Sequence, residues 1–195
     1  MLWLSLVLFV ALAVAVVRGG RLSNLGDIRL RLWLILPVAF AMQAATALLS
    51  DRGWTATLGF WLILISFLLL LVVIVVNKDR KGMWLAGLGV AMNFVVIAVN
   101  GGMPVLEGAA VVASGFESGL NVIDGLKHVP LDEGTRLAFL ADVIPLRLAG
   151  QGQVLSLGDV FLAVGIGRFL EAELRRPVRW FKPGVKLTVG SATRV

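Results

Sequence analysis

Five apolar stretches constrain this chain more than any other feature, and they lie at about 2–17, 32–49, 58–76, 83–99 and 154–170. A helix needs about 20 apolar residues to cross the roughly 30 Å hydrocarbon core of a bilayer. Because water is absent there, each backbone N–H and C=O must be paired within its own segment, as in a helix. The sequence therefore predicts an all-α integral membrane protein with five transmembrane helices in a single domain, 1–195.

The composition agrees with this class and excludes several functions. Apolar residues make up 58% of the 195 residues, whereas soluble domains contain about 45–50%. The absence of Cys excludes disulfides, thiolate metal ligands and Cys nucleophiles. With one His in the chain, we expect no metal site.

Basic residues are distributed unevenly between the connections. Of 18 Lys and Arg, four lie between the first and second stretches, three between the third and fourth, and seven at the C-terminal end. The positive-inside rule then predicts an N-terminus outside and a C-terminus in the cytoplasm. Basic residues that flank spans favour anionic lipids as partners, so the net charge of +6 does not predict a nucleic-acid partner.

Two segments extend beyond the predicted spans. The outer loop, 100–153, is rich in Gly and Pro, and we expect short amphipathic helices in it. One would begin at Pro104 and end before Gly115, and another would cover 132–143 before Pro145. The basic cytoplasmic tail, 171–195, has aromatic residues between its charges, which is typical of a membrane interface.

Two carboxylates at the outer face are candidate site residues. Ser156 and Asp159 have the spacing of a capping box, but a carboxylate that enters a membrane helix is also a functional candidate. Asp142 is expected at a helix C-terminus, where it needs a partner such as Arg136, Arg147 or His128. Alternatively it meets Asp159, because two carboxylates that share a proton can activate water.

Two amides and the single histidine complete the candidate set. Asn100 opens an Asn-Gly-Gly-Met-Pro segment that is typical of a helix end. Asn93 lies seven residues earlier on the same helix face, and an amide in hydrocarbon needs a partner. His128 can transfer protons near neutral pH, although most loop histidines are only solvated. Gly165 and Gly167 are expected to allow close helix packing.

Four motifs in this order resemble a known bacterial family. They are Asn100–Val105, Lys127–Leu131, Thr135–Pro145 and Leu155–Val160. With them the whole chain resembles domain-of-unknown-function family 5317. The resemblance implies a multi-pass protein of the bacterial cytoplasmic membrane and supplies no activity.

A local similarity to signal peptidase II, an aspartic peptidase, involves Ser156 to Asp159 and the apolar run that follows. It implies an outward-facing active site that would use Asp142 and Asp159. Two positions depart from that family: Ser156 replaces an Asn, and Val96 replaces the Asp that follows an Asn by three residues.

The leading hypothesis is a non-enzymatic membrane subunit or a lipid- or quinone-binding module. Its polar cluster would comprise Asn93, Asn100, His128, Asp142 and Asp159 at the outer face. We predict no other cofactor, and we expect membrane lipids and another membrane subunit as partners. A lipid site predicts a pocket near Asn100 and Asp159. The alternative is an outward-facing intramembrane aspartic hydrolase.

Overall fold

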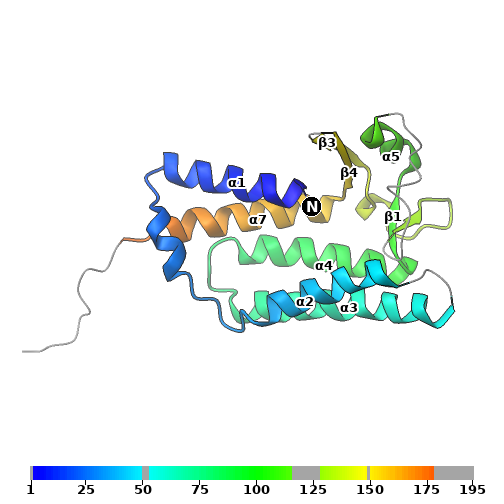
Figure 1. Cartoon of the computed structure of the whole chain (residues 1–195), viewed down its shortest axis with the longest axis horizontal. Helices are drawn as coiled ribbons and strands as arrows, with labels where there is room; N and C mark the ends of the chain where they lie inside the picture. The colour runs from blue at the N-terminus through cyan, green and yellow to red at the C-terminus, as the bar shows by residue number, and fades with distance from the viewer. Residues whose placement is uncertain (1, 50–52, 116–127, 149, 178–195) are drawn as a thin grey trace, which may run out of the picture.

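Five long helices run along the long axis of the molecule in this computed structural model, which describes residues 2–49, 53–115, 128–148 and 150–177 (Figure 1). They are α1 (Leu2–Val17), α2 (Ile35–Ala45), α3 (Gly53–Val76), α4 (Met83–Asn100) and α7 (Leu157–Leu174). Each overlaps one of the five apolar stretches of the sequence, although the bounds of α2, α3 and α7 differ from those expected. The aromatic and basic residues of the tail from 178 onward lie outside the described residues.

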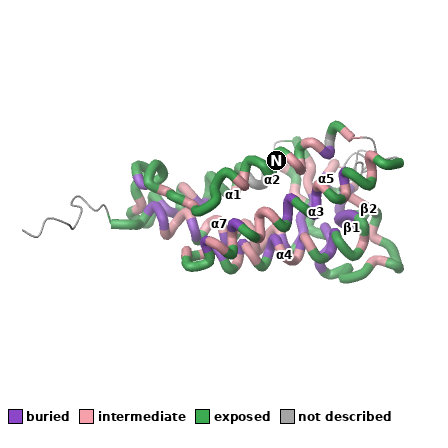
Figure 2. The backbone as a smooth tube through the Cα atoms, turned by 90° about the horizontal axis from the view of Figure 1, so that it is seen from below, coloured by how far each residue is buried: buried purple, intermediate pink, exposed green. Residues whose placement is uncertain are grey.

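α1, α7, α4 and α3 follow one another across the molecule, and α2 lies over α3 (Figure 1). Each helix packs mainly against its neighbours in the order α1, α7, α4, α3, α2, so much of the helix surface has no protein neighbour. Large apolar side chains are exposed on this surface, including Phe9 at 69% and Trp84 at 74%. Figure 2 shows the same helices turned by 90°, with exposed residues among the buried and intermediate ones. These side chains need an apolar environment that the described chain does not provide.

Two of the five helices, α3 with 24 residues and α4 with 18, are long and apolar enough to cross a membrane. They only weakly suggest membrane association, because the core helix of a soluble protein has the same length and composition. The helix α2 has 11 residues, fewer than the 32–49 stretch suggests, because the chain turns at Leu32, with φ of 60°, and continues as a 3₁₀ turn, Thr46–Leu48. The five-span arrangement therefore stays a prediction.

The segment between α4 and α7 is less helical than expected. It contains β1 (Met103–Val105), α5 (Glu107–Ser114), β2 (His128–Pro130), a 3₁₀ turn (Ala138–Leu140), β3 (Ile144–Leu148) and β4 (Gln151–Leu155). β1 and β2 pair in parallel, and β3 and β4 form an antiparallel hairpin. The helix predicted from Pro104 to before Gly115 ends as expected and is α5, but its predicted start is wrong: Met103–Val105 pair with β2, and α5 begins at Glu107.

The predicted helix at 132–143 is wrong. Asp132 instead accepts hydrogen bonds from Gly134 and Thr135 within a turn, and Leu137 has a left-handed φ of 55°, which a helix does not tolerate. The start of the predicted fifth span also differs, because Val154 and Leu155 belong to β4 and α7 begins at Leu157.

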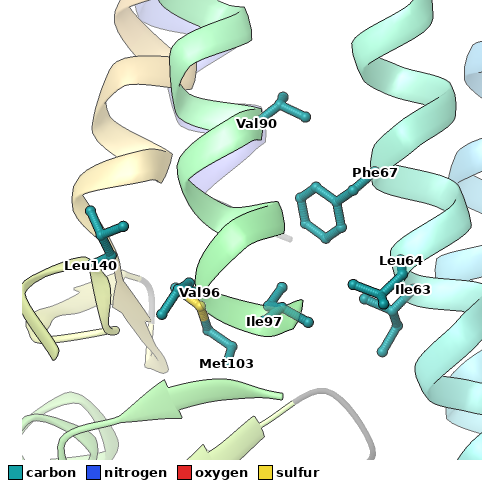
Figure 3. Packing of buried hydrophobic residues seen from close by; sticks show 8 residues of the cluster. All are labelled: Ile63, Leu64, Phe67, Val90, Val96, Ile97, Met103 and Leu140. Carbon is teal, nitrogen blue, oxygen red and sulfur yellow. The ribbon is translucent and has the colours of Figure 1, made fainter. Parts of the chain in front are cut away.

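The main core joins this segment to the bundle. It consists of Ile63, Leu64, Phe67, Val90, Val96, Ile97, Met103 and Leu140 (Figure 3). Phe67 of α3 faces α4, while Val96 of α4 lies beside Met103 of the 101–156 segment, which also contributes Leu140 (Figure 3). A second core of alanines on α5 packs against Val105 and Val154. The segment is therefore packed onto the end of α4 at a defined position.

The connections between the long helices lie at two opposite ends (Figure 1). One end, here called the basic end, holds residues 18–34, residues 77–82 and the end of α7, and includes most of the Arg and Lys described. The 101–156 segment lies at the opposite end. Successive long helices therefore run in alternating directions (Figure 1).

Candidate functional site

Small residues bring α4 and α7 close enough for their polar groups to meet. A Cβ atom at Gly89 would contact the carbonyl oxygen of Gly158 and lie 2.5 Å from the backbone nitrogen of Leu162. A Cβ atom at Gly165 would lie 2.7 Å from Cα of Ala86. Close packing by Gly165 is therefore confirmed. Such approaches are typical of membrane helices, where van der Waals packing replaces the hydrophobic effect.

Asn93, Ser156 and Asp159 form a hydrogen-bonded network where this contact reaches the start of α7. Asn93 Nδ2 donates to Asp159 Oδ1 at 2.9 Å, and Ser156 Oγ donates to Asn93 Oδ1 at 3.0 Å. Ser156 is fully buried and Asn93 is 6% exposed. Each polar atom of the Asn93 amide thus has a partner from the other helix, which its position on an apolar helix requires.

The capping box predicted from sequence is confirmed. The backbone N–H of Ser156 donates to Asp159 Oδ2, and the backbone N–H of Asp159 donates to Ser156 Oγ, both at 3.0 Å. The two bonds satisfy N–H groups that have no partner within the helix. The carboxylate also lies in the first turn of α7, where the helix dipole favours a negative charge. Asp159 therefore has a complete structural role.

Asp142 is buried beside β1 rather than at the end of a helix. Its backbone N–H donates to the carbonyl oxygen of Pro104 at 2.8 Å, and its own carbonyl oxygen accepts from the N–H of Leu106 at 3.0 Å. Its side chain faces His128, with 3.9 Å between Asp142 Oδ2 and His128 Nε2. His128 is one of the three partners expected for Asp142 and lies close enough to form an ion pair with it. The pair carries opposite charges when His128 is protonated.

The two candidate carboxylates have different described partners. Asp159 is bonded to Asn93 and Ser156, whereas Asp142 is bonded to β1 and faces His128. The hydrogen bonds described for the Asp159 carboxylate go to Asn93 and Ser156, and none of them joins the two carboxylates. Catalysis by the pair therefore stays a prediction. In the described part of the chain, no group of three or more acidic or His side chains could hold a metal.

Asn100 joins α4 to the 101–156 segment. Its Nδ2 donates to the carbonyl oxygens of Val96 and Arg136, and its Oδ1 accepts from the N–H of Arg136, all at 2.8 Å. Asn100 is the last residue of α4, as predicted for a helix end. It also donates to and accepts from the backbone of Arg136, which is distant in sequence. Its amide is fully used in holding the segment in place.

Asn77 makes the same arrangement at the basic end and was not predicted. Its Nδ2 donates to the carbonyl oxygens of Val73 and Arg31, and its Oδ1 accepts from the N–H of Arg31. A third amide, Asn24, donates to the carbonyl oxygen of Leu174 at 2.8 Å, at the end of α7. The sequence pattern that could have predicted these amides is an Asn at or beyond the C-terminal end of an apolar stretch.

A buried carboxylate, Glu173, organises charges at the basic end. It pairs with Arg80 and with Arg176, each at 2.9 Å, and its own side chain is only 4% exposed. Arg80 also donates to the carbonyl oxygen of Arg29. The pair therefore joins the α3–α4 connection to the end of α7.

Glu173→Gln is expected to lower the free energy of unfolding by about 1–2 kcal/mol, because a charge-assisted pair of a buried group is replaced by neutral hydrogen bonds. The comparison variant is Glu171→Gln, whose partners Arg18 and Arg175 are more than half exposed and which should change little. Thermal unfolding of both variants in one detergent measures the difference. Equal effects would contradict the special role of Glu173.

The contribution of the Glu171 carboxylate to stability should depend on pH in a defined direction. The hydrogen bond from Arg18 lowers the pKa of Glu171 below its ordinary value of 4.5. A lowered carboxylate pKa contributes stability above the unfolded-state pKa, and that contribution is lost as the pH falls through the lowered value.

The fold and the network define a mostly helical protein with two helices apolar enough to cross a membrane and a mixed segment fixed at one end. The chain belongs to the Family of unknown function (DUF5317), whose model matches residues 27–170.

An "Uncharacterized protein" of Thermotoga maritima is 32% identical over 107 residues, which are 54% of this chain and 60% of that relative. The matched part of this chain thus covers less than two thirds of the relative's length. No solved structure matches the chain. The comparisons do not show the similarity to signal peptidase II.

Proposed function

We propose that this protein is a non-enzymatic multi-pass protein of the bacterial cytoplasmic membrane that acts as a membrane subunit or lipid-binding module. The observation that carries the proposal is the set of large apolar side chains exposed along the helices, among them Phe9, Trp61 and Trp84. Burial of one such side chain contributes about 1.5–3 kcal/mol. Helices with this surface therefore need apolar surroundings, which lipid chains or the apolar face of another subunit supply.

The charge distribution supports five spans with the N-terminus outside and the C-terminus in the cytoplasm. The connections richest in Arg and Lys lie together at the basic end, and the 101–156 segment lies at the other end (Figure 1). The cytoplasmic leaflet is negatively charged and attracts basic segments. The basic end then faces the cytoplasm, and the candidate site residues face outward.

The polar cluster has a positioning role in this proposal. Asn100 and the Asn93–Ser156–Asp159 network join the 101–156 segment to the ends of α4 and α7. The segment would thus be presented to the exterior in a fixed orientation, as a partner subunit requires. Among the described contacts, none favours the aspartic hydrolase that uses Asp142 and Asp159, which remains the alternative.

Single introduced cysteines test the orientation directly, because the chain has no Cys of its own. Glu133→Cys and Lys81→Cys replace exposed residues at the two opposite ends. In intact cells, a membrane-impermeant maleimide should label Glu133→Cys almost completely and Lys81→Cys only at background. After permeabilisation, both variants should be labelled.

Asp27→Cys extends the test to the connection between α1 and α2, and it should behave like Lys81→Cys. Labelling of Lys81→Cys and protection of Glu133→Cys in intact cells would reverse the proposed orientation. If all three positions were protected until lysis and the protein were recovered without detergent, the membrane proposal itself would be wrong.

A further inference from the structure

An apolar groove with a volume of about 380 Å³ lies between α1 and α7. Ala11, Ala163 and Gly167 are among the small residues that line it, and Arg168 and Glu171 line its polar end. The volume is within the range of known ligand sites, about 300–1,000 Å³. The lining includes neither Asn100 nor Asp159, beside which the sequence predicts a lipid pocket.

The length of the groove matches one leaflet of a bilayer. Its lining runs from Leu6 to Val14 on α1 and from Ala163 to Glu171 on α7. Each run rises about 12 Å at about 1.5 Å per residue, close to half of the roughly 30 Å hydrocarbon core. The two helices run in the same direction toward the basic end (Figure 1). The groove therefore extends from the middle of the proposed membrane to its cytoplasmic face.

The groove follows the contact between α1 and α7, where a Cβ atom at Gly167 would lie 3.8 Å from Cβ of Ala11. Apart from Arg168 and Glu171 at one end, its lining residues are apolar. This lining suits a hydrocarbon chain that lies along the two helices with its polar group at the Arg168 end.

The polar end of the groove carries an excess of positive charge. Glu171 is already bonded to Arg18 at 2.7 Å and to Arg175 at 3.3 Å. Arg168 is exposed and makes no ion pair with any described residue. Glu171 is thus shared by two guanidinium groups, and Arg168 adds a third positive charge to the groove lining. Guanidinium groups favour phosphate as a partner.

We propose that the α1–α7 groove binds one anionic phospholipid of the cytoplasmic leaflet, with an acyl chain along the apolar lining and the phosphate on Arg168. The proposal rests on the proposed function, because a lipid reaches the groove only when α1 and α7 lie in a membrane. It differs from general lipid contact in that one molecule occupies a defined place and is selected by charge.

Native mass spectrometry of the full chain in detergent, with added phosphatidylglycerol or phosphatidylcholine, tests this site. The wild type should retain one phosphatidylglycerol in preference to phosphatidylcholine. Arg168→Gln should weaken that retention about ten-fold through loss of a charge-assisted bond, and Ala163→Leu should weaken it by filling the groove. The matched control is Lys81→Gln, an exposed basic residue at the same end that does not line the groove.

Equal losses in Arg168→Gln and Lys81→Gln would show unspecific attraction by the basic end and would overturn the proposal. Retention of a second protein chain in place of lipid would also overturn it. Thermal unfolding of each variant identifies losses caused by misfolding, and Arg168→Gln is expected to unfold like the wild type. If the cysteine labelling gives the proposed orientation while no lipid is selected, the groove proposal fails and the proposed function stands.

Discussion

Gly89→Ala is expected to lower the thermal unfolding midpoint of the detergent-solubilised protein by about 5–10 °C. The added Cβ atom would contact the carbonyl oxygen of Gly158 and lie 2.5 Å from the nitrogen of Leu162, and both are backbone atoms. α4 and α7 must therefore separate along their whole contact. Overpacking of this kind costs about 2–3 kcal/mol, and one kcal/mol corresponds to about 2–4 °C in a chain of this size.

Gly87→Ala is the matched control, because it makes the same change two residues away on the same helix. There the new Cβ atom would lie 3.0 Å from Cγ2 of Ile74, which is one side-chain methyl rather than backbone and needs to shift by only a few tenths of an ångström. Ala also has a higher helix propensity than Gly, which favours the folded variant by about 1 kcal/mol. Its midpoint should be unchanged or slightly raised. Equal destabilisation by both variants would contradict a specific close contact at Gly89.

The positions of the long helices could be predicted because their signal is local and strong. The run from Leu58 to Val76 and the run from Met83 to Val99 contain no charged residue, and both form helices with nearly those bounds. The strands could not be predicted in the same way. β1 and β2 have three residues each, contain Pro104 and Pro130, and pair across more than twenty residues of sequence.

In the candidate site, too, local contacts could be predicted from the sequence and contacts between helices could not. Ser156 and Asp159 are three residues apart, so their capping box follows from local geometry and was predicted. The bond from Asn93 to Asp159 depends on how closely α4 approaches α7, which no local pattern determines. The need of Asn93 for a partner could be predicted, but the identity of that partner could not.

Asn93→Ala is expected to lower the free energy of unfolding by about 3 kcal/mol. The change leaves Asp159 Oδ1 without its bond from Nδ2 and Ser156 Oγ without its acceptor. Ser156 is fully buried, and a buried polar group left without a partner costs about 1–3 kcal/mol. Thermal unfolding in the same detergent measures the loss, which should be about 6–12 °C.

Asp159→Asn completes a double-mutant cycle with Asn93→Ala. The two oxygens of Asp159 accept one N–H each, from Asn93 and from the backbone of Ser156. An asparagine has one oxygen and one NH₂ group, so one of the two donors would face another donor. The single change should cost about 1–2 kcal/mol, and the double variant should cost less than the sum of both singles.

Additive losses would contradict the network, because they would mean that the two side chains act independently. If Asp159→Asn is as stable as the wild type but loses a bound lipid or partner, the carboxylate serves binding and the structural role assigned to it here is wrong.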